Sequence, residues 1–421
     1  MRILVISNSE WDDQGAGGNT LSNWFGGWNN SVFFNVYPRL SLPNNTCCKE
    51  YYSVSPFSLI RFFFRPSKVG RRFSVKEQII VSRHQKKEKK VISWIHKRAR
   101  GIAYLINDFL YDIVRWQNDK YVRFIKECNP DIVFSFATGD TFRRQNLEYV
   151  KQHTHAKIIT FVADDVYTIY SDRSSVLMRR YKKNFEDIMY MSDMVYGASE
   201  MMCSEYGRLF NIQMKPLYKG CHFMGVKDVI NNPLRIVYAG NLQYGRINSL
   251  AKIADVLEVI NQHTIKCYLE IYTGSDITPE INEKLNRKQS SRICGPRPYE
   301  TIKQILHQAD IVLQVESFEP QQQKIVRFSF STKITDCMQS GSVLMVIGPK
   351  GISSVEYTKN IPGVLLATDP DEIGNLLKNV LNNPMELLSR AKQIHEFSIR
   401  NHSLNSVRKA LQHDFNEVIR L

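Results

Sequence analysis

Short apolar runs alternate with helix-forming segments in two successive series along this 421-residue sequence. Runs of this length are typical of buried parallel strands, and each parallel connection needs a crossover, usually a helix. The predicted strands are 2–6, 32–37, 130–136, 158–165, 192–199 and 215–220 in the first series, and 234–240, 265–274, 292–295, 311–315, 342–348 and 363–367 in the second. The alternation predicts an α/β protein with two doubly wound, Rossmann-like domains.

The break between the two series is marked by composition. Residues 222–233 contain Gly225, Asn231, Asn232 and Pro233, which are typical of a linker. We therefore expect one domain over 1–221 and another over 234–402. The stretch 38–56 has no clear period and is predicted to be irregular, whereas 58–127 is predicted to be a helical insertion in the first domain.

The net charge of +15 is concentrated in this predicted insertion. Residues 60–130 carry roughly 18 Lys and Arg against about six Asp and Glu. Candidate partners are nucleic acid, an anionic membrane surface or phosphorylated substrates. A basic amphipathic helix containing Trp94 and Trp116 suits a membrane interface, and a solvated helix face is the alternative. Nucleic acid is the weakest candidate because the sequence has no RNA- or DNA-binding signature beyond charge.

The sequence predicts a cytoplasmic protein. No apolar run reaches the roughly 20 residues of a membrane span, and the N-terminus has no signal-peptide pattern. The eight cysteines form no CxxC pair, so we expect reduced thiols. The basic segment adds the expectation of peripheral attachment at the inner face of the plasma membrane.

One stretch of the second series, residues 310–341, combines a strand, a polar loop and a helix start. Ser329, Ser331 and Thr332 stand where the helix should begin, with Lys333 in its first turn. Hydroxyl side chains cap helices, and the free N–H groups of a helix start bind anions. Lysine opposes the helix dipole there and indicates an anionic ligand. An ordinary capped helix with a solvated lysine is the alternative.

Two further sites are predicted in the first series. A glycine loop at 15–19 follows the first strand, but Thr20 replaces the third glycine of a dinucleotide fingerprint, so we expect no such cofactor there. Gly17, Gly18 and Asn19 instead predict close approach of a ligand to the backbone. Asp164 and Asp165 end a predicted strand at the edge where α/β sheets bind ligands, and helix capping is the alternative.

No metal site is predicted. Asp369, Pro370 and Asp371 match the metal-binding pattern DxD. However, Asp369 fits the N-cap of a helix, Pro370 fits its first position and Glu372 fits its third position. The sequence also contains no His/Cys cluster with zinc spacing.

Several motifs resemble the GT-B glycosyltransferases, and more specifically the retaining, glycogen-synthase-like family 4 enzymes that build bacterial capsules and other surface polysaccharides. The similarity covers nearly the whole chain. The motifs that carry it are 238–250, 293–314, 310–341 and 348–357. The resemblance implies two Rossmann-like domains that face a cleft, with the acceptor side in the first domain and the nucleotide-sugar in the second. It also implies that a helix over 403–421 crosses back to the first domain.

The resemblance implies a donor site in the second domain. Gly240, Asn241 and Arg246 match the glycine loop whose basic residue reaches the diphosphate, and Arg297 matches a loop near the base. Asp336 matches the carboxylate that binds ribose, whereas Phe328 stands at the family's other glutamate, for which Glu316 or Glu319 could substitute. Residues 329–333 resemble a variant in which hydroxyls and Lys333 hold the diphosphate. In the first domain the loop 15–20 faces the cleft, and Asp164 and Asp165 lie near a His–Asp pair that lacks its histidine here.

The implied activity is transfer of a sugar from a nucleoside diphosphate sugar, most simply a UDP-sugar, to an acceptor hydroxyl with retained configuration. Arg246 and Lys333 are expected to stabilise the leaving diphosphate without a metal, as in other hexosyltransferases of this kind, with Asp164 or Asp165 orienting the acceptor. A glycan or polyprenyl-linked precursor is the expected acceptor. The alternative is a non-catalytic protein that binds nucleotide-sugars.

Overall fold

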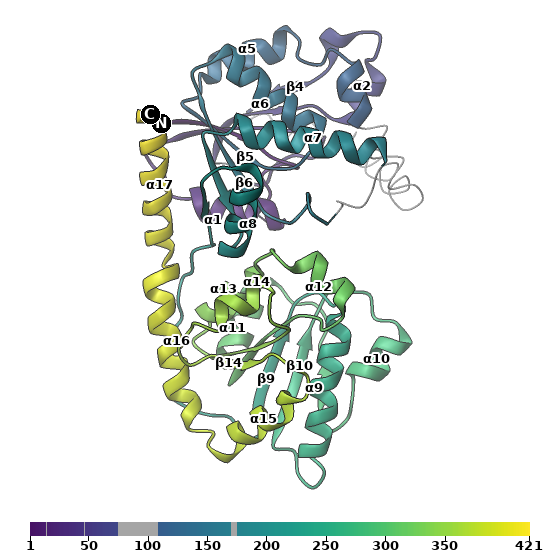
Figure 1. Ribbon diagram of the computed structural model, residues 1–421, viewed down its shortest axis with the longest axis vertical. Helices are drawn as coiled ribbons and strands as arrows, with labels where there is room; N and C mark the ends of the chain where they lie inside the picture. The colour runs from purple at the N-terminus through teal and green to yellow at the C-terminus, as the bar shows by residue number, and fades with distance from the viewer. Residues whose placement is uncertain (14, 46, 75–107, 170–174) are drawn as a thin grey trace. The chain divides into compact units, whose positions relative to one another are not determined.

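The computed structural model describes residues 1–13, 15–45, 47–74, 108–169 and 175–421 (Figure 1). The chain divides into two compact units. Unit 1 comprises Met1–Leu217 and Arg408–Leu421, and unit 2 comprises Tyr218–Val407. Each unit is built on one largely parallel sheet. The predicted fold class, α/β with two doubly wound domains, is confirmed.

The sheet of unit 1 has eight strands, which pair in parallel except for β3 with β4. In their order across the sheet they are β4 (Arg71–Phe73), β3 (Cys48–Ser53), β2 (Val32–Tyr37), β1 (Arg2–Ile6), β5 (Ile132–Phe136), β6 (Lys157–Val162), β7 (Met194–Gly197) and β8 (Met214–Pro216). The strand order reverses between β1 and β5. Loops on either side of such a reversal diverge and leave room for ligands at the carboxyl ends of the strands.

Aromatic side chains fill both faces of this sheet. The helices of unit 1 that lie wholly within its described N-terminal part are α1 (Ala16–Phe25), α2 (Pro56–Arg61), the 3₁₀ turn η1 (Pro66–Lys68), α5 (Asp119–Cys128), α6 (Thr141–His153), α7 (Val176–Met191) and α8 (Glu200–Phe210). Trp24 of α1 packs edge-on against Phe134 of β5. Neighbouring strand residues point to opposite faces, so Phe34 of β2 packs instead against Phe124 of α5. Helices on both faces thereby bury the strands.

Three predictions for residues 48–127 of unit 1 are wrong. Residues 48–53, predicted to be irregular, form β3, and the exposed Lys49 and the half-buried Glu50 hid its strand character. The predicted insertion at 58–127 is not wholly extra, because β4 pairs with β3 and α5 precedes β5 as a crossover helix. Trp116 is buried, and its indole N–H donates to Gln145, so it cannot serve a membrane interface. Lys86, Trp94 and the rest of 75–107 lie outside the described residues.

The sheet of unit 2 is entirely parallel, with six strands. Across the sheet they are β11 (Ser291–Ile293), β10 (Cys267–Tyr272), β9 (Leu234–Ala239), β12 (Ile311–Val315), β13 (Val343–Ile347) and β14 (Leu365–Ala367). The chain runs from β9 to one edge of the sheet, and it then returns to β12 on the other side of β9. The reversal of strand order therefore lies between β9 and β12.

Two groups of helices cover the faces of this sheet (Figure 1). The helices in chain order are α9 (Arg246–Ile260), α10 (Pro279–Leu285), α11 (Tyr299–Gln308), α12 (Pro320–Val326), α13 (Thr332–Gln339), α14 (Ser353–Thr358), α15 (Glu372–Asn382), α16 (Glu386–His402) and α17 (Leu404–Arg420). α9 packs with α10 and α15, whereas α13 packs with α16. The predicted strands of this unit agree with these bounds within about two residues, but α15 begins two residues later than expected.

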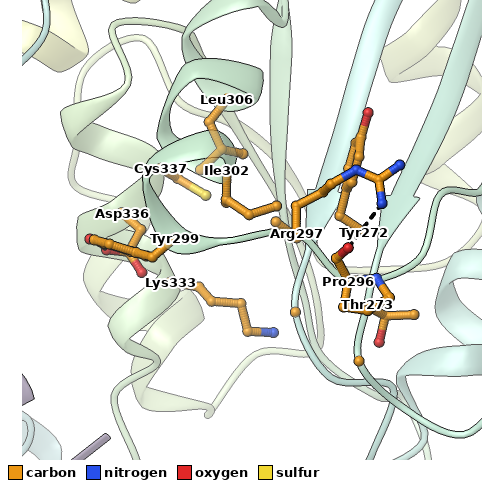
Figure 2. A pocket seen from close by; sticks show the side chains of 13 residues that line it. Tyr272, Thr273, Pro296, Arg297, Tyr299, Ile302, Leu306, Lys333, Asp336 and Cys337 are labelled. Atoms are coloured by element: carbon orange, nitrogen blue, oxygen red, sulfur yellow. Dashed lines mark hydrogen bonds between the residues drawn. The ribbon is translucent and has the colours of Figure 1, made fainter. Parts of the chain in front are cut away.

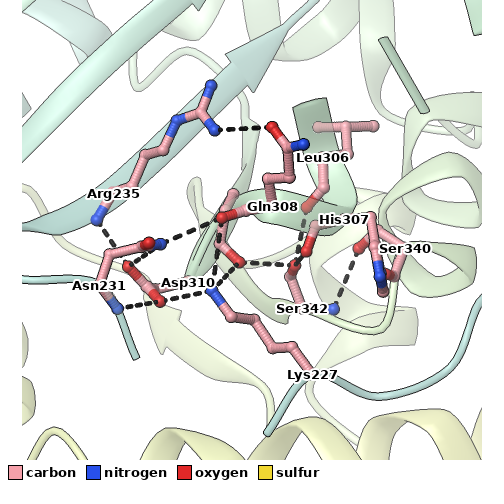
Figure 3. Close-up of polar contacts among 10 residues, drawn as sticks. Lys227, Asn231, Arg235, Leu306, His307, Gln308, Asp310, Ser340 and Ser342 are labelled. Carbon is pink, nitrogen blue, oxygen red and sulfur yellow. Dashed lines mark hydrogen bonds and ion pairs between the residues drawn. The ribbon is translucent and has the colours of Figure 1, made fainter. Parts of the chain in front are cut away.

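The connection before β9 is fastened to unit 2 by a buried carboxylate (Figure 3). Residues 222–233 contain no helix or strand. Asp310, whose side chain is fully buried, pairs with Lys227 at 2.8 Å and accepts backbone N–H groups from Asn231 and Arg235. The Asn231 amide also donates to it at 3.0 Å. These contacts place residues 227–235 in unit 2, whose boundary with unit 1 falls at Leu217 rather than at the predicted 221.

The last helix, α17, begins in unit 2, and its residues from Arg408 onward belong to unit 1. Arg408 donates to the backbone carbonyls of Ser22 and Asn23 at the end of α1. Phe415 packs against Phe25 and Phe134. Among the described residues, no helix is long and apolar enough to cross a membrane.

Replacing Asp310 tests whether the buried carboxylate fastens this connection. Asp310→Ala leaves the Lys227 ammonium and two backbone N–H groups without their acceptor. We expect the free energy of unfolding of unit 2 to fall by about 3–5 kcal/mol in urea titrations. Asp371→Ala is the control, because Asp371 is 90% exposed and lies 3.5 Å from Lys252; it should change stability by less than about 1 kcal/mol. Equal effects of the two substitutions contradict the assignment.

Candidate functional site

The candidate site lies at the carboxyl edge of the unit 2 sheet, where the strand order reverses. Gly240 follows β9, and Glu316 follows β12. The helices that come next in the chain also begin at this edge, α9 at Arg246 and α13 next to Lys333. The reversal therefore brings together side chains that are far apart in the sequence.

Arg246 joins the two loops on either side of this reversal. Its Nη2 lies 3.2 Å from a Glu316 carboxylate oxygen, and its Nε donates to the carbonyl of Val315 at 3.1 Å. Its Nη1 donates to the Asn241 side-chain oxygen at 2.7 Å. The side chain is nearly fully buried. The guanidinium is therefore held in a fixed orientation, as a bidentate anion contact requires.

Lys333 reaches the same place from α13. Its ammonium donates to the Tyr238 hydroxyl at 3.0 Å and lies over that ring, 4.8 Å from its centroid. A Cβ on Gly240 would come within 2.6 Å of this ammonium. Glycine at 240 is thus what gives the lysine its path across the end of β9. The sequence alone did not single out Tyr238, although it opens the same glycine-loop motif.

The electrostatics of this cluster favour an added anion. Burial and, after it, the neighbouring Arg246 together lower the pKa of Lys333 to about 7, against the opposing effect of Glu316. Burial likewise raises the pKa of Glu316, against the effect of Arg246 and Lys333. Two cationic side chains thus share one carboxylate away from bulk water. A bound anion would relieve the repulsion between them and restore the charged form of the lysine.

A cavity of about 310 Å³ adjoins Lys333 (Figure 2). Figure 2 shows the lysine between Tyr299 and Asp336 on one side and Thr273 and Pro296 on the other. The lining residues are Ala239, Gly240, Tyr272, Thr273, Gly274, Pro296, Arg297, Tyr299, Ile302, Leu306, Lys333, Asp336 and Cys337. The exposed Arg297 lines it too, and its guanidinium donates to the carbonyl of Pro296 at 3.0 Å. The cavity is open to a planar or sugar-like group attached to the anion.

Asp336 presents a carboxylate to this cavity from the second turn of α13. The Tyr299 hydroxyl donates to its Oδ1 at 2.9 Å, and burial raises the pKa of the carboxyl. Tyr299 was missed at the sequence level, because its contact with Asp336 spans 37 residues. One carboxylate oxygen is thus positioned by the protein at the lining of the cavity.

The loop before α13 is anchored to the neighbouring helix. Ser331 is the N-cap residue, and its backbone N–H donates to the Ser354 hydroxyl at 3.2 Å. Thr332 is exposed at the first helical position, and the half-buried Ser329 precedes them. Phe328, at the place of the family's other glutamate, is buried. Glu319 accepts from Asn248 at 2.5 Å, so Glu316 is the glutamate that lies with Arg246 and Lys333.

The two aspartates predicted in unit 1 have different surroundings. Asp165 is buried, and it accepts from the Tyr206 hydroxyl at 2.7 Å and from the backbone N–H of Thr168 at 2.9 Å. The Thr168 hydroxyl also donates to it. These contacts are those of a carboxylate that holds a turn together. Asp164 is exposed after β6, so the predicted acceptor role fits Asp164 better.

The predicted glycine loop of unit 1 is wrong in its secondary structure. Gly17, Gly18 and Asn19 lie in the first turn of α1, which begins at Ala16. A Cβ on Gly18 would stand 2.1 Å from the carbonyl oxygen of Asp12. The need for glycine at 18 is therefore explained by packing of the helix against the preceding loop.

The DxD-like segment is part of a helix start, as predicted, but with shifted positions. Asp371 is the N-cap of α15, and the Glu372 carboxylate accepts the backbone N–H groups of Thr368 and Asp369. Within the part of the chain that the structure describes, no group of three or more His, Cys, Asp or Glu side chains could hold a metal ion.

Comparison with known proteins shows the fold. No family model matches the sequence, and no curated protein matches it. HepE of Anabaena, solved in complex with UDP and glucose, aligns over 99% of both chains with 11% identity and a TM-score of 0.58. The E. coli trehalose-6-phosphate structure with bound UDP-2-fluoro glucose aligns over 99% of both chains with 12% identity and a TM-score of 0.60.

A third structure is similar to the same extent. The UDP-forming α,α-trehalose-phosphate synthase of Burkholderia vietnamiensis aligns over 99% of this chain and 100% of its own, with 11% identity and a TM-score of 0.56. At such identities the similarity establishes architecture only. The chain thus has the GT-B fold, two Rossmann-like domains, that these glycosyltransferases share.

Removing the lysine charge should stabilise the ligand-free protein. The folded-state pKa of Lys333 is about 7, and its unfolded value is about 10.4. Below about pH 7 both states carry the proton, so the folded state bears the full penalty of the buried charge; between about pH 7 and 10 the unfolded chain binds more protons, and wild-type stability rises with pH. We expect Lys333→Met to raise the free energy of unfolding by about 1–3 kcal/mol near pH 6, with a gain that shrinks toward pH 10.

The control for this measurement is Lys252→Met, because the Lys252 side chain is 44% exposed. It should show no such dependence on pH in urea titrations. A Lys333→Met protein that is less stable than the wild type near pH 6 contradicts a strained cation pair.

Proposed function

We propose that this protein is a glycosyltransferase that moves a sugar from a UDP-sugar to an acceptor hydroxyl. The observation that carries the proposal is the pair of cations, Arg246 and Lys333, held with one carboxylate beside a cavity at the strand-order reversal of unit 2. A diphosphate has the charge and size to bind between them. The structural neighbours with bound UDP or UDP-2-fluoro glucose support uracil as the base.

The donor fits the described groups in a definite order. The diphosphate contacts Arg246 and Lys333, with the N-terminal N–H groups of α13 nearby. Asp336, already positioned by Tyr299, accepts hydrogen bonds from the ribose hydroxyls. The base occupies the cavity on the Pro296 and Arg297 side. Gly240 and Asn241 shape the phosphate end, and Ser329, Ser331 and Thr332 border it.

The proposed chemistry is departure of the diphosphate with retention at the anomeric carbon. Negative charge grows on the leaving phosphate oxygens while the sugar becomes oxocarbenium-like. Fixed cations aimed at those oxygens stabilise this state more than the ground state. Arg246 and Lys333 supply that charge, so we propose that transfer proceeds without a metal. For same-face attack, the leaving phosphate oxygen takes the acceptor proton, and Asp164 orients the acceptor.

The finer assignments belong to the same proposal. The acceptor is a glycan or a polyprenyl-linked precursor of a surface polysaccharide, and the enzyme is of the family 4, hexosyl-transferring type. A non-catalytic nucleotide-sugar binder is the second candidate, and the burial of Phe328 at the position of a family glutamate favours it. Release of UDP from UDP-glucose, with sugar transferred to an acceptor or to water, distinguishes the two: binding without any turnover supports the second.

Loss of either cation should weaken UDP binding. A charged contact is worth about 1.5–3 kcal/mol, so we expect Lys333→Ala to weaken binding roughly ten- to hundredfold in calorimetric titrations. Arg246→Ala alone would leave the buried Glu316 carboxylate without its ion-pair partner. The substitution is therefore combined with Glu316→Gln in a double variant, for which we expect a similar loss of UDP affinity. Lys252→Ala, on the exposed side of α9, is the matched control. Wild-type affinity in the Lys333 and Arg246 variants excludes the phosphate assignment.

The pH dependence of donor binding should reveal the titration of the Lys333 ammonium. UDP-glucose carries no phosphate group that titrates near neutrality, and binding favours the charged ammonium. In the ligand-free protein, the Lys333 ammonium has a pKa of about 7. Affinity should therefore be constant below about pH 7 and fall by up to about tenfold per pH unit above it, because binding must then take up a proton.

The control for the pH dependence is Lys333→Arg, in which the residue at 333 stays charged. This variant should give a flat profile between about pH 6 and 9. A wild-type profile that is flat over the same range contradicts direct contact between Lys333 and the donor.

A further inference from the structure

A segment at the edge of unit 1 exposes apolar and basic side chains together. It consists of α2, the turn after it and η1 (Figure 1). We call it the Phe–Arg surface, and its members are Phe57, Ile60, Arg61, Phe63, Phe64, Arg65 and Lys68, all of which are exposed. Phe64 is 92% exposed and Ile60 59% exposed. Large side chains this open to water in one short segment indicate contact with another apolar phase.

The backbone of this segment is firmly held, so the exposed side chains sit on a fixed platform. The Ser55 side chain caps α2 by accepting the N–H of Ser58. Leu59 is fully buried beneath the helix, and Val69 is buried beyond η1. The Asn118 side-chain amide donates to the backbone carbonyls of Pro66 and Val69, at 2.8 and 2.9 Å, at the two ends of η1. With Leu59 facing the core, Phe57 and Ile60, three residues apart, share the outward side of the helix.

The charge of the segment has one sign only. Residues 54–74 contain five cationic residues and no Asp or Glu; the cations are Arg61, Arg65, Lys68, Arg71 and Arg72. Arg72 pairs with Glu50 and Glu127. Arg61, Arg65 and Lys68 form no ion pair with any residue in the described parts of the chain. The Phe–Arg surface therefore combines apolar tips with cations that no carboxylate in the described parts of the chain neutralises.

We propose that the Phe–Arg surface docks the protein on a membrane that carries anionic lipid. Phenylalanine tips enter the interfacial region of a bilayer, and flanking Arg and Lys contact the anionic headgroups. Charge complementarity selects this occupant over a neutral apolar partner. Exposed phenylalanines on a helix and turn, outside any cavity found in the described residues, suit shallow insertion better than capture of a partner's side chain.

Docking of this kind extends the proposed function, because it would bring the enzyme to acceptors carried on lipid. It does not depend on that function. Binding to vesicles requires neither nucleotide nor turnover, so vesicle binding and UDP binding can succeed or fail separately.

Co-sedimentation of the full chain with vesicles tests the proposal. One set of vesicles contains phosphatidylcholine alone, and the other contains phosphatidylcholine mixed with phosphatidylglycerol. We expect binding to the anionic set that weakens as salt is added. Phe63→Ser with Phe64→Ser should weaken it about ten- to hundredfold. Arg61, Arg65 and Lys68 replaced by Ser should weaken it about hundredfold, because each charge contributes about fivefold.

Matched controls come from exposed positions of unit 2. Val259→Ser replaces an apolar side chain that is 61% exposed on α9. Lys378, Lys392 and Arg400 replaced by Ser remove the same charge as the basic triple variant. Both controls should bind anionic vesicles like the wild type. Unchanged thermal unfolding of the Phe63/Phe64 variant, whose side chains are exposed, shows that it is folded.

Three outcomes overturn the proposal. One is wild-type binding by the Phe63/Phe64 variant, which would make the surface a general site for polyanions. Another is an equal loss in the charge control, which would make net charge the cause. The third is no binding to anionic vesicles at all. Binding of a single-stranded oligonucleotide that depends on the same phenylalanines would assign the surface to nucleic acid instead.

Discussion

The carboxylate of Glu316, placed between a buried arginine and a half-buried lysine, is the constraint on which the rest of this site depends. Arg246 and Lys333 would repel each other in a site away from water, and Glu316 compensates only one of them. Two features keep this arrangement in place: glycine at 240, where a side chain would block the lysine, and the Tyr238 hydroxyl, which accepts a hydrogen bond from the ammonium. Such unrelieved charge is typical of sites that await an anion.

The topology explains why this cluster forms at one edge of one sheet. β9 and β12 are neighbours although more than 70 residues separate them, and the helices after them approach from opposite faces. Each contributes one cation at its start. Unit 1 has the same kind of reversal between β1 and β5, but there the start of α1 is packed against the preceding loop, and the buried Asp165, after β6, holds a turn together. Among the described groups, the two cations that we propose to bind the diphosphate thus both lie in unit 2.

Much of the fold could be predicted from the sequence, because buried parallel strands are continuous apolar runs. β12 was predicted to the residue, and Arg246 and Lys333 were identified together. What failed had physical reasons. β3 contains polar residues, so it does not read as an apolar run. The first turn of α1 contains glycines, which are typical of loops. Trp116 is buried in the core rather than exposed to a membrane. The contacts of Tyr238 and Tyr299 with the site could not be predicted, because they depend on which helix lies over which strand end.

The most direct measurement is the pKa of the Lys333 ammonium, followed by NMR in protein labelled at its lysine side chains, with Lys333→Arg to assign the signal. The cluster described here predicts a pKa of about 7 in the free protein. Saturating UDP-glucose should raise that pKa by at least about one unit, because the diphosphate stabilises the charged form. A pKa near the ordinary value of about 10.4 that does not move on addition of the nucleotide-sugar contradicts the account.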